Sequence, residues 1–278
     1  MKCKVYKAYD PQVSREISPL DRIDAAFADT HKMLDYIQNQ KPEIMGKYIQ
    51  SIKNRLNEEL DGFHILDGRF DFDEIIEKYP SAEHYPRLYE LTLDFVCKNL
   101  ELSRNHKFGD DKITVLSVKS IGSVTITRYH RINAMIDVLG RKSGIQLYKD
   151  YVCYRTSLPV EEKIKGTIKE FREQAIKNWS SAKAVDFAVY VFDEYKHVCK
   201  FTNCISYDAL KHLDDAEVGY LAQCYPSTFM VNQLYERLGQ RRSVTLFNHP
   251  YCDELYWDKG VYPDPEQPSL EFMDKIVI

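Results

Sequence analysis

The sequence changes its periodicity near residue 109, and this change limits the folds that the chain can adopt. Before it, apolar residues recur at helical spacing, as in the run from Ile23 to Ile37. After it, runs rich in β-branched residues alternate with further helical segments. This order predicts an α+β fold with an antiparallel sheet and flanking helices rather than a doubly wound parallel sheet. We expect a mainly helical region over residues 1–108 and an α+β region over residues 109–278.

The helical region opens with a capping sequence. In Ser18-Pro19-Leu20-Asp21, a hydroxyl precedes a proline at the first helical position and an acid in the first turn. This arrangement predicts a helix start at Pro19. Further helices are expected over residues 42–60, 70–78 and 84–102.

The second region predicts strands as well as helices. Two β-branched runs, 113–118 and 123–127, flank Gly122 and predict a hairpin. Helices are expected over residues 133–139, 160–179, 207–212, 217–223 and 227–239. Ser227 would cap the last of these, and Gly239 would lie just past its end. Strands are expected over residues 185–192, 243–247 and 254–257.

The charge and apolar content exclude several classes of partner. With 38 basic and 42 acidic residues the net charge is -4, so the composition lacks the excess of basic residues that is typical of nucleic-acid-binding proteins. The longest apolar run, 185–192, contains Asp186 and is far shorter than the roughly 20 residues of a membrane span. The first residues lack the apolar segment of a secretory signal, and the seven cysteines are an odd number. We therefore expect a cytoplasmic protein with reduced thiols.

Several catalytic motifs are missing from the sequence. None of the 11 glycines forms GxGxxG or GxxxxGK[ST], so a phosphate-cradling loop is not expected. The serine-hydrolase elbow GxSxG and the zinc motif HExxH are also absent. A nucleotide-driven enzyme, an α/β-hydrolase and a thermolysin-like protease are therefore disfavoured, and no cofactor is expected.

Candidate chemistry gathers near the C-terminus, where a predicted strand ends in a turn with His249, Cys252 and Asp253. A thiol is a good nucleophile only as thiolate, so it needs a nearby base or cation. His249 is placed to supply one, and Asp253 to orient a histidine or activate water. The alternative is a purely structural turn.

Metal binding is a second interpretation of the same residues. Cys199 and Cys204 are separated by four residues, and His249 and Cys252 by two. Two such pairs resemble the ligand spacing of a structural zinc site. The pairs are 44 residues apart, so the fold would have to bring them together.

A longer set of motifs is similar to one known family. The matching segments are, in order, the strand Asp186–Phe192, Cys204, Tyr207-Asp208-Ala209-Leu210, Glu217-Val218-Gly219-Tyr220-Leu221, Cys224, Arg242-Ser243-Val244-Thr245-Leu246 and Cys252-Asp253. Together, residues 185–257 resemble the L-2-amino-thiazoline-4-carboxylic acid hydrolase family. Three positions depart from its pattern. Ser227 replaces an aspartate, Asn248-His249 stands where a glycine is expected before the last motif, and Glu254 replaces a phenylalanine.

The resemblance implies hydrolytic opening of a cyclic isothiourea, the aminothiazoline ring, towards a carbamoyl-cysteine. Either a cysteine thiolate attacks the carbon between nitrogen and sulfur, or water attacks it with Asp253 or His249 as base. Cys252 is the first candidate nucleophile because those two residues accompany it. Cys224 is the second, since it precedes a predicted helix start, and Cys204 is either structural or part of the same pocket.

The expected partner is a small molecule, with no nucleic acid or membrane, and a homo-oligomer is left open. The candidate substrate-binding residues are Arg242, Thr245, Ser227 and Tyr220. Arg242 would bind a substrate carboxylate, or would be an ordinary solvated strand residue. Two other functions remain open. The departures at Ser227 and Glu254 suggest a biosynthetic transferase or cyclase on the same scaffold, and the cysteine pairs suggest a non-catalytic, zinc-stabilised binding module.

Overall fold

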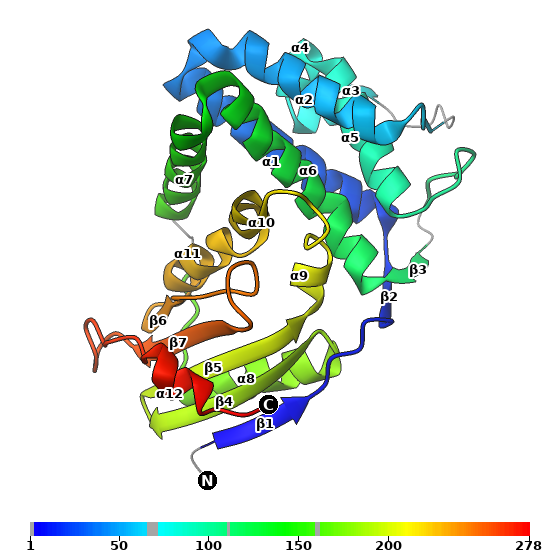
Figure 1. Cartoon of the computed structure of the whole chain (residues 1–278). Helices are drawn as coiled ribbons and strands as arrows, with labels where there is room; N and C mark the ends of the chain where they lie inside the picture. Colours follow the sequence, from blue (N-terminus) through cyan, green and yellow to red (C-terminus); the bar gives the residue numbers. More distant parts are fainter. Residues whose placement is uncertain (1–2, 66–71, 110–111, 159–161) are drawn as a thin grey trace. The chain divides into compact units, whose positions relative to one another are not determined.

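The computed structural model describes residues 3–65, 72–109, 112–158 and 162–278. The chain forms two compact units: Ser14–Tyr151, here called the helical unit, and Met1–Val13 with Val152–Ile278, here called the sheet unit. The predicted α+β class is confirmed, since helices accompany a five-stranded antiparallel sheet (Figure 1).

The helical unit is built around four long helices. Its elements are β2 (Ser14–Ile17), α1 (Pro19–Gln40), a 3-10 turn (Pro42–Ile44), α2 (Met45–Leu60), α3 (Phe72–Lys78), α4 (Ser81–His84), α5 (Pro86–Asn99), β3 (Ile113–Leu116), α6 (Ser117–Leu139) and most of α7 (Arg141–Ser157). Helices α1, α2, α5 and α6 pack together around buried apolar side chains such as Phe27, Ile52 and Leu91. Burial of these amphipathic faces drives the packing of the unit.

The helices expected in the first hundred residues are confirmed, with shifts of a few residues at their ends. Ser18 caps α1, because its Oγ accepts a hydrogen bond from the backbone N–H of Asp21 at 3.4 Å. The helix expected over 42–60 is the 3-10 turn followed by α2, and the one over 84–102 is α5. The 70–78 helix is α3, and its expected first two residues lie outside the described part of the chain.

The predicted hairpin is wrong. Only 113–116 form a strand, β3, which pairs with β2, while residues 123–127 lie inside α6. Within α6 the hydroxyls of Ser123, Thr125 and Thr127 donate to backbone carbonyls three or four residues earlier, at 2.6–2.9 Å. These bonds satisfy the hydroxyls inside the helix, and packing of α6 against α2 and α5 overrides the β preference of the residues.

The domain boundary expected near residue 108 lies inside the helical unit. Helix α6 packs against α2 and α5, so the segment after residue 109 belongs with the helices before it. The residues that join the sheet unit instead begin at Val152, and the first thirteen residues belong to that unit through strand β1. A boundary inferred from local periodicity could not reveal this, because strand pairing joins distant parts of the chain.

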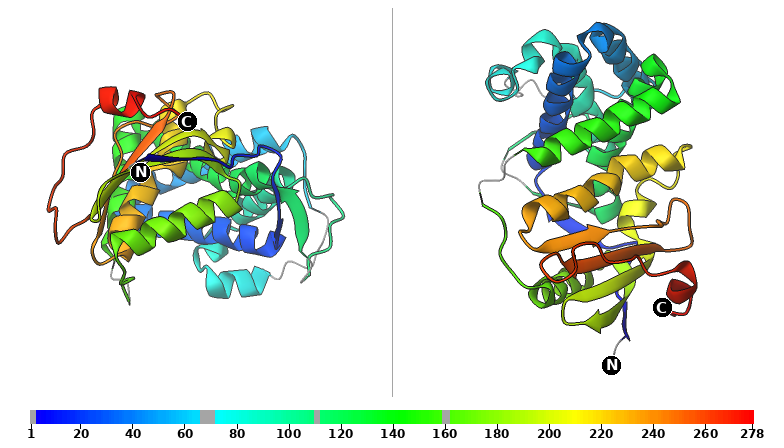
Figure 2. Two further views of the ribbon diagram at one scale, coloured as in Figure 1. Left: turned by 90° about the horizontal axis from the view of Figure 1, so that it is seen from below. Right: turned by 90° about the vertical axis from the view of Figure 1, so that its left-hand side faces the viewer.

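The sheet unit contains strands β1 (Cys3–Lys7), β4 (Val185–Asp193), β5 (Lys196–Cys204), β6 (Leu238–Arg241) and β7 (Cys252–Asp258). Its helices are α8 (Ile168–Ser181), α9 (Ile205–Asp208), α10 (Ala216–Gln223), α11 (Tyr225–Leu234) and α12 (Leu270–Asp274). The strand order is β1-β4-β5-β7-β6, and every neighbouring pair is antiparallel. Figure 2 shows the strands side by side, with α8 along one face.

Each face of the sheet has its own apolar core. On one face, Phe187, Phe201 and Tyr256 pack with side chains of α8 and α11. On the other, Leu255 and Trp257 pack with the C-terminal segment that includes α12. Because successive residues of a strand point to opposite faces, β7 places Cys252, Glu254 and Tyr256 toward α8, and Asp253 on the other side.

Three elements expected in the sheet unit are confirmed in position: the strand over 185–192 is β4, the strand over 254–257 lies within β7, and the helix over 217–223 is α10. Three helices differ in their bounds. The helix expected over 207–212 overlaps α9 by only two residues, because α9 ends at Asp208 and residues 209–212 form turns. Helix α8 starts at Ile168 rather than 160, because Thr167 and Glu170 form a capping box. Helix α11 spans Tyr225–Leu234, so Ser227 is not its cap, and Gly239 lies in strand β6 rather than just past the helix end. The Ser227 Oγ donates to the Cys224 carbonyl at 2.7 Å.

The strand expected over 243–247 is also wrong. The backbone N–H groups of Ser243 and Val244 donate to the Asp253 carboxylate, both at 2.8 Å, and so are not available to a neighbouring strand. Thr245 begins a turn, since its carbonyl accepts hydrogen bonds from the N–H groups of Asn248 and His249. The edge strand forms earlier instead, as β6.

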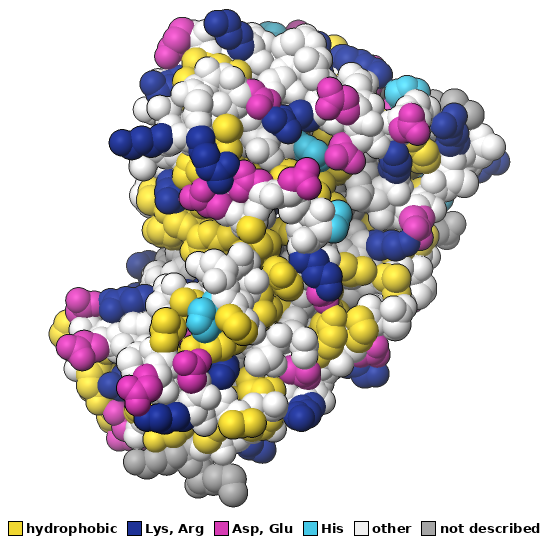
Figure 3. Space-filling model, in the orientation of Figure 1, with side chains coloured by type: hydrophobic (Ala, Val, Ile, Leu, Met, Phe, Trp, Pro, Cys, Tyr) yellow, Lys and Arg dark blue, Asp and Glu magenta, His cyan; other side chains and the backbone are white. Residues whose placement is uncertain are grey.

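The surface carries charges of both signs. In Figure 3, Lys and Arg side chains are interspersed with Asp and Glu side chains over the face shown. Such mixing agrees with the small net charge of -4. In the part of the chain that the structure describes, no helix is both long and apolar enough to cross a membrane.

Candidate active site

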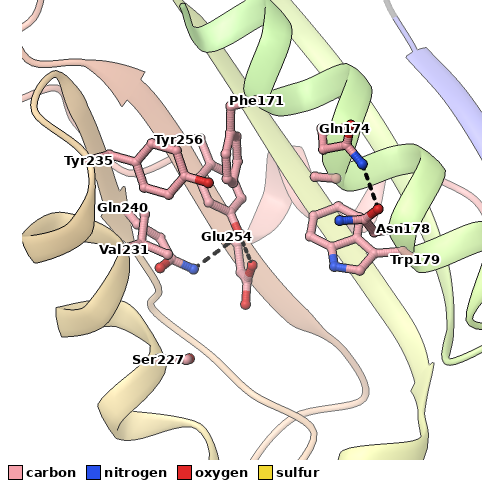
Figure 4. Close-up of a pocket in the computed structure, with 11 residues that line it drawn as sticks. Phe171, Gln174, Asn178, Trp179, Ser227, Val231, Tyr235, Gln240, Glu254 and Tyr256 are labelled. Carbon is pink, nitrogen blue, oxygen red and sulfur yellow. Dashed lines mark hydrogen bonds between the residues drawn. The ribbon is translucent and has the colours of Figure 1, made fainter. Parts of the chain in front are cut away.

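A cavity of about 340 Å³ lies between helices α8 and α11 and strands β6 and β7, and we call it the α8 pocket (Figure 4). Aromatic side chains of two elements and a connecting segment line it: Phe171 and Trp179 of α8, Tyr235 after α11, and Tyr256 of β7. Two buried polar residues, Glu254 and Gln240, also line it. Its volume is in the range of small-molecule sites.

Among the described residues that line the α8 pocket, Glu254 is the only acidic one, and it is 8% exposed. One oxygen of its carboxylate pairs with the guanidinium of Arg242, and the other accepts a hydrogen bond from the Tyr256 hydroxyl. Arg242 also donates from Nη1 to the Cys224 carbonyl at 3.0 Å. A buried carboxylate needs such partners, because burial without them would be very costly.

The hydrogen-bonded chain continues from Tyr256 to Gln240, whose Nε2 donates to the Tyr256 hydroxyl oxygen at 3.1 Å. Burial, followed by the charge of Glu254, raises the pKa of Tyr256 well above its ordinary value. The phenol is therefore a permanent donor to Glu254 near neutral pH. Gln240, Tyr256, Glu254 and Arg242 thus form one connected polar group at the pocket.

The candidate nucleophiles Cys252, Cys224 and Cys204 lie close enough to one another, and to Glu254, for their charges to interact. Burial raises the pKa of Cys252 to about 12. Two interactions oppose this rise: the Leu246 N–H donates to the Cys252 Sγ at 3.1 Å, and the positive charge of Arg242 also lowers the pKa. Burial also raises the pKa of Cys224 and Cys204. At neutral pH these residues are thiols rather than thiolates, contrary to what a nucleophilic role requires.

Asp253 does not join Cys252 in the arrangement that the sequence suggested. It is fully buried on the opposite face, where its carboxylate accepts from the Ser243 and Val244 N–H groups, the Ser243 hydroxyl and Gln267 Nε2. The His249 ring packs against Tyr251, with centroids 4.2 Å apart, and its Nδ1 is buried without a hydrogen-bond partner in the described structure. Asp253 therefore anchors the segments that contain Ser243, Val244 and Gln267. It neither orients His249 nor faces the pocket.

The four predicted substrate-binding residues divide between two cavities. Arg242, Thr245 and Tyr220 line a second cavity of about 380 Å³ beside α10. Ser227 lines the α8 pocket. The Arg242–Glu254 ion pair connects the linings of the two cavities, because one partner belongs to each.

The predicted zinc ligands do not assemble. Over the described ranges, no three His, Cys, Asp or Glu side chains gather closely enough to hold a metal ion. Cys199 is buried in the apolar core between the sheet and α8. The pairing of Cys199 and Cys204 with His249 and Cys252 is therefore not formed.

Three residues that define the α8 pocket are not among the candidate site residues predicted from the sequence: Glu254, Tyr256 and Gln240. Glu254 was noted only as a departure from a family pattern. The β7 sequence contained a signal, since Glu254 lies on the same face of the strand as Cys252 and Tyr256. A carboxylate inside a buried strand indicates a partner cation or a site.

The comparisons with known proteins add no assignment, because no family model, no curated protein and no solved structure matches this chain.

A buried histidine, His197, lies on the sheet face that packs against α8, and its titration is expected to make stability depend on pH. His197 is 1% exposed and stacks on Tyr256, with ring centroids 5.2 Å apart. Burial, helped by the charge of Arg172, lowers the pKa of His197 to about 3. As pH falls from about 6.5 to about 3, His197 is protonated in the unfolded chain but stays neutral in the folded chain. The unfolding free energy therefore falls by about 1.4 kcal/mol per pH unit.

A His197→Phe variant keeps a stacked ring and removes this titration. We expect its unfolding free energy to fall less steeply than that of the wild type between pH 6.5 and 4. Urea unfolding followed by tryptophan fluorescence measures this in the sheet unit, which contains both tryptophans, Trp179 and Trp257. Equal slopes for the two proteins would contradict the prediction.

Proposed function

We propose that the protein is a hydrolase that acts on a C–N or C–S bond of a small, amino-acid-derived cyclic isothiourea or amidine. The reaction takes place in the α8 pocket. Glu254 holds the cationic ring and acts as the base for the attacking water. The observation that carries the proposal is a buried carboxylate in the lining of an aromatic-walled cavity.

The chemistry of the pocket suits a flat cation. Phe171, Trp179 and Tyr256 supply aromatic surfaces, and a cation over such a surface is stabilised by about 0.5–2 kcal/mol. Glu254 supplies a negative charge in the same cavity. A protonated isothiourea or amidine ring is planar, cationic and rich in N–H donors, so it complements both features.

The proposed reaction needs one water molecule. Its oxygen bonds to the ring carbon between nitrogen and sulfur while Glu254 accepts a proton from the water. The C–S or C–N bond then breaks as Glu254 returns that proton to the leaving sulfur or nitrogen. The hydroxyl proton of the adduct is released to solvent as a carbonyl forms. Glu254 ends the cycle ionised, with Arg242 and Tyr256 holding its carboxylate in place throughout.

The raised pKa of Cys252 supports attack by water rather than by a cysteine thiolate. Deprotonating a thiol with a pKa of about 12 at pH 7 has an unfavourable free energy of about 7 kcal/mol.

All seven cysteines are free in the structure, which supports a reducing, cytoplasmic setting for the protein.

The proposal is tested with 2-aminothiazoline-4-carboxylate in water enriched in ¹⁸O. We expect mass spectrometry to show a product heavier than the substrate by one labelled water. A product that instead carries a group passed to an added amine, without label, would favour the transferase or cyclase. No conversion and no binding by the folded protein would overturn the proposed function.

A further inference from the structure

The hydrogen bonds around Tyr256 have a fixed direction. The Glu254 carboxylate, which pairs with Arg242, accepts hydrogen bonds, and the Tyr256 hydroxyl donates to it. The Tyr256 oxygen is then an acceptor for its second neighbour, Gln240. Gln240 must therefore present its NH₂ group to Tyr256, as the 3.1 Å contact from Nε2 shows.

This direction leaves the other end of the Gln240 amide without a partner. Gln240 is 5% exposed, and its Oε1 is buried with no hydrogen bond among the described residues. A buried acceptor of this kind lowers stability by about 1–3 kcal/mol, so an unpaired one in the lining of a cavity indicates a ligand group that completes it.

The backbone holds Gln240 in this position. Asn232 of α11 accepts from the Gln240 N–H at 3.0 Å and donates to its carbonyl at 3.1 Å. Figure 4 shows the Gln240 side chain on the same side of the pocket as Glu254 and Tyr256. The amide is thus fixed by its backbone at one end and by Tyr256 at the other.

We propose that Gln240 determines specificity by accepting a hydrogen bond from a second N–H group of the ligand, next to the N–H group that Glu254 binds. This inference rests on the proposed function and narrows it. The site selects amidinium-type groups, which carry two donors, over carbonyl analogues, which place an acceptor at one of these positions. With a carbonyl ligand, Oε1 of Gln240 would face another acceptor.

The test compares the affinities of two probes by isothermal titration calorimetry: 2-aminothiazoline-4-carboxylate and its 2-oxo analogue, 2-oxothiazolidine-4-carboxylate. The variant is Gln240→Met, which keeps the length of the side chain and removes its acceptor. Gln146→Met, on an exposed face of the helical unit, is the control substitution. Thermal unfolding of each variant establishes that it is folded under the conditions of the titration.

We expect the wild type and Gln146→Met to bind the amino compound more tightly than the oxo compound. In Gln240→Met, the ratio of the two dissociation constants should shrink by about tenfold. If Gln240→Met is folded and keeps the full preference, the role of Gln240 is overturned while the role of Glu254 stands. If the wild type binds neither compound, the proposed function fails, and the inference about Gln240 fails with it.

Discussion

Replacing Asp253 by alanine is expected to lower the unfolding free energy of the sheet unit by about 3 kcal/mol or more. Asp253 is fully buried, and its carboxylate accepts from four donors. Three of these donors belong to Ser243 and Val244, and the fourth to Gln267 in the C-terminal segment. Alanine leaves them without their acceptor, so both segments lose these hydrogen bonds to β7.

A matched substitution separates this effect from the loss of any aspartate. Asp264 also lies in the sheet unit, but its side chain is 82% exposed and pairs with Arg241 at the surface. We expect Asp264→Ala to change stability by less than about 1 kcal/mol. Urea unfolding followed by tryptophan fluorescence compares the two variants, and equal losses would contradict the structural role assigned to Asp253.

Replacing Glu254 by glutamine is expected to reduce turnover by about 10²–10⁴-fold, the usual contribution of a general base. The amide keeps the size of the side chain but accepts no proton from water and has no charge to hold a cationic ring. The substitution also leaves the buried Arg242 without its counterion. That loss is expected to lower the unfolding free energy by about 3–5 kcal/mol.

A second variant separates lost chemistry from lost stability. In the double variant Glu254→Gln with Arg242→Met, neither buried charge is present, so most of the lost stability should return. Turnover should not return, because the base is still missing. A double variant that recovered both stability and turnover would show that Glu254 acts only through folding.

Local sequence signals predicted the elements that depend on local interactions. Ser18 and Pro19 start α1 as expected, because a cap and a fixed φ act within one turn. The run 123–127 failed for the opposite reason, since its helix is selected by packing against α2 and α5. The strand expected over 243–247 failed because a carboxylate ten residues away binds its N–H groups.

The candidate site divides in the same way. The sequence singled out Cys252, Arg242 and Tyr220, and the structure brings these residues close enough for their charges to interact. It could not show that burial keeps the thiol protonated, or that Asp253 turns to the other face. Nor could it identify Glu254, whose role depends on a partner twelve positions earlier in the sequence.

Turnover of 2-aminothiazoline-4-carboxylate by Cys252→Ala is the most direct test of the claim that Glu254 and water, rather than a thiolate, perform the reaction. We expect kcat/KM within about threefold of the wild type, since a neutral thiol contributes no nucleophile. A loss of about a thousandfold in a variant with unchanged unfolding free energy would contradict it and assign the attack to Cys252.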